Sequence, residues 1–206
     1  MRFAICLALS VLAASGLSAQ MPRKELDVAK QRAAIEAWTA CIADENRESV
    51  ARTLARDFTS AEYQREMTKL AQTRGSGRCF NAMPAKYRRI ELGGLPFAGG
   101  LAERLLETHP DPLVLRLSRA VAGKAPATYS YTDAVAMCAV RGAPHVVAAL
   151  FETPINSPEE VHALADVKPV FDICARQGGR PVEASAMGMR SMLATASFRL
   201  LQAQES

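Results

Sequence analysis

The sequence predicts an all-α protein, a helical bundle of two pseudo-symmetric repeats with one disulfide in each. Apolar residues recur at helical spacing in nearly every segment, and the alternating pattern of strands is scarce. Outside the N-terminal apolar run the cysteines are even in number, and they fall at nearly the same spacing in the two halves of the chain. These observations predict helices, disulfides and an internal duplication.

The first 19 residues have the pattern of a signal peptide. Arg2 supplies the charged start, an apolar run extends from Phe3 to Ala14, and small residues ending at Ala19 form a cleavage pattern. This run is too short to cross a hydrocarbon core of about 30 Å as a helix, and no later segment approaches the roughly 20 apolar residues that a span needs. We therefore expect a periplasmic or secreted protein without a membrane span.

The charge of the mature chain is mild. The full chain has 25 Lys and Arg against 21 Asp and Glu, and loss of residues 1–19 removes one arginine, which leaves a net charge of about +3. A nucleic-acid-binding face needs clustered basic residues. The nearest cluster is Lys86, Arg88 and Arg89 around Tyr87, which we interpret as a solvated loop. No nucleic-acid partner is expected.

Four cysteines remain after processing: Cys41, Cys79, Cys138 and Cys174. An even count in an exported protein predicts disulfides, because the compartment outside the cytoplasm is oxidising. Metal binding is the alternative, but the chain has no Cys-x-x-Cys pair, and structural zinc sites usually take two ligands from one short turn. In principle three pairings are available to four cysteines.

The cysteine spacing indicates the duplication and selects one pairing. Cys41 and Cys138 are 97 residues apart, and Cys79 and Cys174 are 95 apart. Self-similarity at a fixed offset is typical of a repeated supersecondary unit. By symmetry we expect Cys41 to pair with Cys79 and Cys138 with Cys174. At the offset of 97, further residues that match their counterparts are Ala37, Val50, Ala51, Ser60 and Glu62.

The first repeat is expected to cover residues 20–106. Trp38 and Cys41 share one face of its first helix, so this cysteine points inward. Ser60 is a hydroxyl N-cap for the third helix. The glycine-rich stretch 75–100 predicts a long loop whose only covalent tie is Cys79. The predicted helices of this repeat lie near residues 25–44, 47–57, 61–72 and 98–108.

Residues 107–130 are expected to link the repeats through one helix near 112–122 and a loop. The second repeat then covers residues 131–206. Ser157, with Pro158 and an acid three residues after the serine, begins its third helix. Pro169 predicts a break in that helix. The helices of the second repeat are expected near residues 131–141, 144–152, 158–176 and 187–203.

The sharpest candidate for a polar site is Glu159, His162 and Asp166, which share one helix face. A Glu-x-x-His pair on a helix is half of a di-metal carboxylate arrangement, and this arrangement needs a second such pair. The matching positions of the first repeat hold Arg65 and Lys69, which cannot bind a cation. A solvated helix face explains these residues equally well, and we assign no metal ligand.

His145 is the remaining candidate. It follows a proline at a predicted helix start and could lie near Cys138, where a free thiol would make a Cys–His pair worth testing. A disulfide-bonded cysteine cannot act as a nucleophile. The chain lacks a Gly-x-Ser-x-Gly elbow, a phosphate-binding glycine loop and a haem-attachment motif. We therefore assign no catalytic residue and no cofactor.

The chain resembles short exported helical proteins of alphaproteobacteria for which no activity is known. The resemblance lies in a helix with a cysteine, a Ser-Pro-Glu-Glu helix start, a second cysteine, and final helices ending in Ala-Glu-Arg-Leu-Leu or Ser-Phe-Arg-Leu-Leu. It covers both repeats. Its motifs are structural, so it implies a fold and no activity.

The absence of catalytic motifs favours binding over catalysis. We expect a periplasmic binding or interaction module, whose partner is an envelope protein or a cell-wall component, and a homodimer is a further alternative. The alternative function is a cell-envelope hydrolase with a carboxylate or histidine site. A polar cleft with a buried unpaired group would favour the hydrolase, and a broad exposed apolar patch would favour the interaction module.

Overall fold

The computed structural model describes residues 27–73, 77–88 and 90–205. Within these ranges the regular elements are helices, and no strand is present. The all-α fold class predicted from the sequence is therefore confirmed. The predicted signal peptide, residues 1–19, lies outside the described residues.

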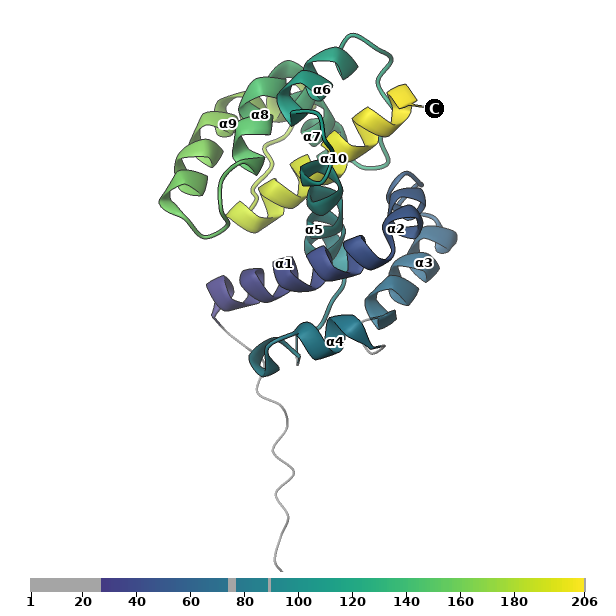
Figure 1. The fold of residues 1–206 in the computed structure, drawn as a ribbon. Helices are drawn as coiled ribbons and strands as arrows, with labels where there is room; N and C mark the ends of the chain where they lie inside the picture. Colours follow the sequence, from purple (N-terminus) through teal and green to yellow (C-terminus); the bar gives the residue numbers. More distant parts are fainter. Residues whose placement is uncertain (1–26, 74–76, 89, 206) are drawn as a thin grey trace, which may run out of the picture.

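Two helices form the centre of the molecule. They are α5 (Gly94–Glu107) and α10 (Ala186–Glu205), and both run through the middle of Figure 1. Of the helix pairs in the described chain, these two have the most extensive contact. The last helix of the chain therefore packs on a helix that lies about 90 residues earlier in the sequence.

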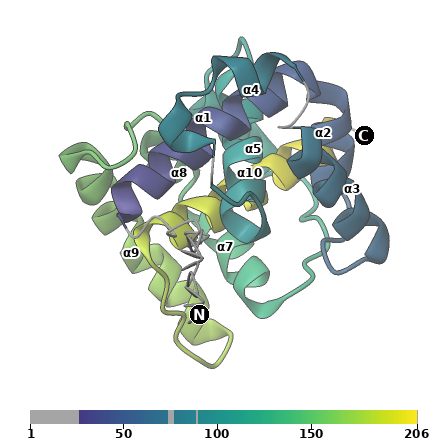
Figure 2. The ribbon, with the colours of Figure 1, turned by 90° about the horizontal axis from the view of Figure 1, so that it is seen from below.

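The other helices form two groups at opposite ends of α5 (Figure 1). Seen from below, α2 and α3 lie on one side of α5, and α8 and α9 lie on the opposite side (Figure 2). The first group consists of α1 (Val28–Glu45), α2 (Arg47–Leu54), α3 (Ala61–Gln72) and α4 (Arg78–Ala82). The second group consists of α6 (Leu113–Ala120), α7 (Tyr131–Gly142), α8 (Pro144–Phe151) and α9 (Pro158–Gln177).

Two glycines let α5 approach its neighbours closely. A Cβ added at Gly99 would lie 2.4 Å from the Cβ of Ser191 on α10. A Cβ added at Gly100 would lie 2.5 Å from Oγ1 of Thr39 on α1. Glycine inside a helix costs roughly 1 kcal/mol relative to alanine. Because neither residue has a Cβ, α5 can lie directly against α10 and α1.

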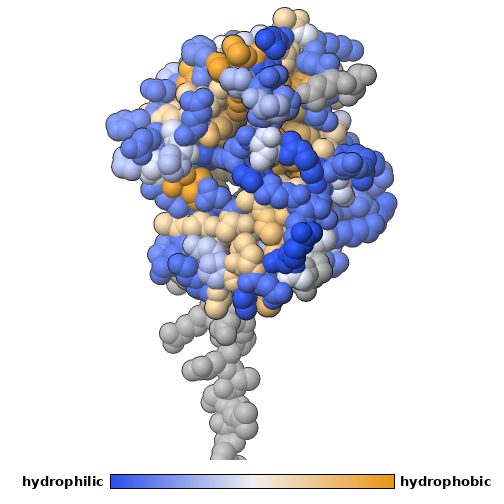
Figure 3. All heavy atoms as spheres, viewed as in Figure 1, coloured by the Kyte–Doolittle hydropathy of each residue, from blue (hydrophilic) through white to orange (hydrophobic). Residues whose placement is uncertain are grey.

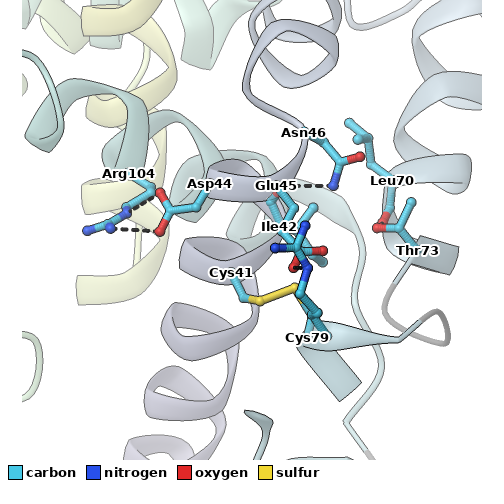
Figure 4. Close-up of a disulfide and its surroundings, with 10 residues drawn as sticks. Cys41, Ile42, Asp44, Glu45, Asn46, Leu70, Thr73, Cys79 and Arg104 are labelled. Carbon is cyan, nitrogen blue, oxygen red and sulfur yellow. Dashed lines mark hydrogen bonds and ion pairs between the residues drawn. A yellow bond between two sulfur atoms is a disulfide. The ribbon is translucent and has the colours of Figure 1, made fainter. Parts of the chain in front are cut away.

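Both disulfides form as expected. Cys41 of α1 bonds to Cys79 of α4 (Figure 4), with the two Cα atoms 5.7 Å apart. Cys138 of α7 bonds to Cys174 of α9, with the Cα atoms 5.9 Å apart. These separations are normal for disulfides. Each bridge closes a loop within one half of the chain, and the two disulfides are consistent with an oxidising compartment.

The stretch 75–100 is not the long loop that its glycines predict. It contains α4, the 3₁₀ turn η2 (Ala85–Tyr87) and the start of α5 at Gly94. Tertiary contacts hold these short elements, because Cys79 is buried and the indole N–H of Trp38 donates a hydrogen bond of 2.9 Å to the Tyr87 carbonyl oxygen. Helices this short carry too few residues for a periodic pattern.

The predicted break at Pro169 is also wrong, because α9 continues through it to Gln177. A proline inside a helix leaves the carbonyl of the fourth residue before it without its amide partner. Here that residue is Ala165, and both it and Pro169 lie on the exposed face of α9. Water can therefore satisfy the carbonyl, and the buried face holds the helix together.

The helix bounds keep the offset predicted for the two halves. α1 ends at Glu45 and α7 ends 97 residues later at Gly142. The helices that follow, α2 and α8, both have 8 residues. Ser60 and Ser157 are the N-caps of α3 and α9, and each side chain accepts a hydrogen bond from the amide three residues on. The duplication itself stays a prediction.

The face shown in Figure 3 is largely hydrophilic with apolar areas between the polar ones, and the large exposed apolar side chains of the described residues are scattered over several elements. Within the described residues, no single helix is long and apolar enough to cross a membrane, although α7 and α8, which meet at 102°, pass that test together by length and composition. The large exposed apolar residues are Val28, Phe80, Leu95, Leu115, Val161 and Ile173.

Candidate functional site

A cavity of about 300 Å³ lies where helices of the two groups meet on α5 and α10. We call it the Tyr63 cavity. Its apolar wall consists of Leu54, Phe58, Met67, Leu95, Ala98 and Met192. Its main polar residues are Tyr63, Gln64, Asp133, Thr195 and Arg199. Apolar walls with a few converging polar groups are typical of small-molecule sites, although this volume is at the lower end of their range.

Three helices begin at this cavity. Tyr63 of α3, Gly94 of α5 and Asp133 of α7 all belong to the first turn of their helix. The N-terminus of a helix carries a partial positive charge and amide groups without intrahelical acceptors. Three helix ends of this kind therefore border the cavity, and their dipoles favour negative charge there.

The three helix ends differ in capping. Ser60 caps α3 by accepting from the Tyr63 amide, and Ser130 caps α7 by accepting from the Asp133 amide. The N-cap of α5 is Gly93, and no side chain makes a cap hydrogen bond there. The first-turn amides of α5 are consequently open to another acceptor.

Tyr63 is the central polar side chain of the cavity. It is nine-tenths buried, with 9% of its surface exposed, and its hydroxyl makes no hydrogen bond within the described part of the chain. Burial raises the pKa of Tyr63 to about 12, against a smaller lowering by the charge of Arg199. At neutral pH the phenol is therefore a protonated donor that lacks an acceptor.

Arg199 is the second polar side chain with a free donor. Its Nη1 donates to both carboxylate oxygens of Asp133, at 2.7 and 2.8 Å, and its Nη2 donates to the Ala127 carbonyl oxygen. The guanidinium carbon also lies 4.7 Å from the ring centre of Tyr129. Its Nε makes no hydrogen bond among the described residues. The Arg199–Asp133 pair is neutral overall but leaves one donor at the cavity.

A second cavity adjoins the first. It measures about 410 Å³ and shares Gln64, Met67 and Gly94 with the Tyr63 cavity. The first residue of α5 thus lies at the junction of the two spaces. The one acidic residue that lines the second cavity in the described chain is Glu91.

A separate buried ion network ties the two halves together. Arg190 of α10 donates to Glu103 of α5 at 2.5 Å and to Glu160 of α9 at 3.1 Å. Arg32 of α1 also donates to Glu160, with one hydrogen bond of 2.8 Å. Burial raises the pKa of Glu160, but the hydrogen bonds from Arg32 and the Asn156 amide outweigh it and leave this pKa lowered. We call these four side chains the Arg190 network.

The network is a structural feature in this fold. The cavity beside it is only about 60 Å³, room for a few water molecules. Three acids line that cavity, Glu36, Glu103 and Glu107. Partial burial, then the charge of Glu103, raises the pKa of both Glu36 and Glu107. The sequence identified Glu160 only as a capping acid, because its arginine partners lie 128 and 30 residues away with no linking pattern.

The polar residues singled out from the sequence do not form a site. Glu159, His162 and Asp166 lie exposed on α9, and they are absent from the one group of three potential metal ligands in the described chain. His145 is exposed on α8. Cys138 is bonded to Cys174, so no thiol is available to pair with His145.

The single group of three potential metal ligands surrounds the first disulfide (Figure 4). It consists of Cys41, Glu45 and Cys79. Both sulfurs are bonded to each other, and Glu45 forms an ion pair of 3.1 Å with Arg78. Cysteine binds zinc and softer metals as the thiolate, so the oxidised pair offers them no sulfur ligand.

Comparisons with protein-family models, curated proteins and solved structures find no match to this chain. The resemblance to exported alphaproteobacterial proteins stays a prediction.

Proposed function

We propose that the protein is an exported binding module, periplasmic or secreted, that holds a small amphipathic molecule in the Tyr63 cavity. The observation that carries this proposal is the pairing of an apolar wall with two donors on largely buried side chains, Tyr63 and Arg199, that make no hydrogen bond within the described chain. Neither donor atom is sealed from solvent, since Ser197 Oγ is the one buried side-chain atom without a partner among the described residues. Both donors are therefore available to a ligand that enters the cavity.

The cavity favours binding over hydrolysis. A general base needs a carboxylate or imidazole that is free to take a proton. Asp133 is the only carboxylate among the residues lining the cavity, and it already accepts from Arg199 and from the Tyr129 amide at 2.8 Å. The scattered exposed apolar residues also favour a small ligand over a broad protein interface.

The test is a titration of the exported protein with 1-octanol, a small neutral amphiphile, followed by amide NMR. We expect saturable shifts concentrated at residues 54–72, 94–98 and 192–199. The variant Leu95→Trp should weaken binding at least about tenfold, or about 1.4 kcal/mol, because Leu95 lines the cavity and is already 40% exposed, so a larger ring can block the space without disturbing the core.

The matched control is Leu115→Trp. Leu115 is 49% exposed on α6 and lines none of the cavities described above. It should leave octanol binding unchanged. Shifts that do not saturate, or equal losses in the two variants, would overturn the proposal.

A further inference from the structure

We propose that the ligand of the Tyr63 cavity is an amphipathic monocarboxylate, with its carboxylate at the N-terminus of α5 and its apolar body against Met67 and Met192. This inference depends on the function proposed above. It adds the charge and the orientation of the ligand.

The first step concerns the open end of α5. This helix has 14 residues, its N-cap Gly93 offers no side-chain acceptor, and Pro96 has no amide hydrogen. The amides of Gly94, Leu95 and Phe97 therefore have no intrahelical or side-chain cap acceptor. Helix N-termini of this kind bind carboxylates and other anions, because the amides and the helix dipole both favour negative charge.

The second step is independent of the helix. The Tyr63 hydroxyl and the Arg199 Nε–H both lack acceptors among the described residues, and both side chains are more than nine-tenths buried. Gly94, Tyr63 and Arg199 all line the same cavity. Donors from two side chains and one helix end thus line the same cavity.

The third step sets the charge of the ligand. The positive charge of Arg199 is balanced by Asp133, so the helix dipoles supply the remaining attraction. Dipoles of about half an elementary charge suit one negative charge. A phosphate dianion would call for an unpaired lysine or arginine, and no such residue lines this cavity in the described chain. Glu91, which lines the adjoining cavity, would repel a second charge.

The fourth step sets the body of the ligand. The wall beyond the donors is apolar and includes two methionines, whose flexible side chains adapt to irregular shapes. A space of about 300 Å³ suits a body about as large as a medium-length alkyl chain or one aromatic ring. Octanoate is therefore a suitable probe, and 1-octanol is its neutral counterpart.

The first experiment compares octanoate with 1-octanol on the exported protein and on Tyr63→Phe. The substitution removes one hydroxyl and keeps the ring. We expect octanoate to bind more tightly than octanol to the native protein, and Tyr63→Phe to weaken octanoate about tenfold while octanol changes less than about twofold, since a hydrogen bond to a charged group is worth about 1.5–3 kcal/mol.

The second experiment places a competing carboxylate at the end of α5. Gly93 has extended backbone with φ of 168°, and a Cβ added there meets nothing within 4 Å, so Gly93→Asp and Gly93→Asn both fit. Each caps the helix, but only aspartate adds charge. Gly93→Asp should weaken octanoate at least about tenfold and clearly more than Gly93→Asn does, while octanol binding stays within about twofold, because only charged ligands compete with the new carboxylate.

The outcomes separate the two proposals. If octanol and octanoate bind equally and Tyr63→Phe affects neither, the binding site stands and the carboxylate assignment is overturned. Equal effects of Gly93→Asp and Gly93→Asn on octanoate also overturn the assignment, because the carboxylate then lies elsewhere. If neither probe binds at the cavity, both proposals fail.

Discussion

At the scale of single residues, Glu160 is the shared acceptor of two buried arginines, Arg32 of α1 and Arg190 of α10. Cys41 needs a single partner. A repeat and an even count predict its pairing with Cys79, and the structure has that pairing. Glu160 shows the opposite case. Its place after Ser157 correctly indicates a helix start. No pattern in the neighbouring sequence predicts its hydrogen bonds with Arg32 and Arg190, which lie 128 and 30 residues away.

Glu160→Gln should lower the free energy of unfolding by about 3 kcal/mol, because two buried guanidinium groups would lose their shared carboxylate. Urea denaturation of the oxidised protein measures this change. The matched control is Glu159→Gln, an exposed neighbour on the same helix turn, which should change the stability little. Equal effects of the two substitutions would show that the Arg190 network does not stabilise the fold.

Neutralising Glu36, an acid beside that network, is expected to have the opposite effect on stability. Burial, then Glu103, raises the pKa of Glu36 above its usual 4.5, so the folded protein holds this proton more tightly than the unfolded chain does. Above the folded pKa the ionised carboxylate therefore costs stability. Glu36→Gln should stabilise the protein at pH 7, and the gain should shrink as the pH falls toward 4.5. Denaturation midpoints at several pH values test this, and a gain that grows toward acid would contradict it.

At the scale of elements, caps were predictable and close contacts were not. Ser60 and Ser157 each precede a helix and cap it, as hydroxyl N-caps do. The glycine-rich stretch 75–100, by contrast, predicts a loop that overlaps the helix expected near 98–108, and α5 in fact begins at Gly94. Glycine occupies positions 99 and 100 of this helix because the surfaces of α10 and α1 leave no space for a Cβ. Only the packed structure shows that requirement.

Gly99→Ala tests whether packing or helix propensity decides at this position. Propensity alone would stabilise α5 by roughly 1 kcal/mol. The new Cβ would lie 2.4 Å from the Cβ of Ser191, and overpacking of this kind costs about 1–3 kcal/mol, so a net loss of stability is expected. For comparison, the Cβ of Gly188→Ala would lie 3.3 Å from the Oγ of Ser185 and 3.9 Å from the Cβ of Ala184, so this substitution should destabilise the protein less than Gly99→Ala does. Thermal unfolding of both variants gives the answer.

At the scale of the whole molecule, the duplication hypothesis relates the Tyr63 cavity of one half to the Arg190 network of the other. At the predicted offsets Tyr63 corresponds to Glu160, and Leu95 corresponds to Arg190. Tyr63 and Leu95 line the Tyr63 cavity, which measures about 300 Å³. Their counterparts, Glu160 and Arg190, belong to the Arg190 network beside a space of about 60 Å³. On this hypothesis one copy keeps an open site, and the other fills the same place with ion pairs that join the halves.

Removing one disulfide tests whether each half is a unit. In the chain-entropy model a loop of 38 residues contributes up to about 3.5–4 kcal/mol. Replacing Cys41 and Cys79 together by alanine should therefore destabilise the protein. Hydrogen exchange should speed up mainly at residues 78–87, since the bridge is the one covalent contact of this stretch with α1, beside the Trp38 hydrogen bond to Tyr87 and the Arg78–Glu45 ion pair. The matched change at Cys138 and Cys174 should act on α7 and α9. If either pair of substitutions raised hydrogen-exchange rates equally in both halves, the chain would unfold as one cooperative bundle. The hypothesis of two units would then be wrong.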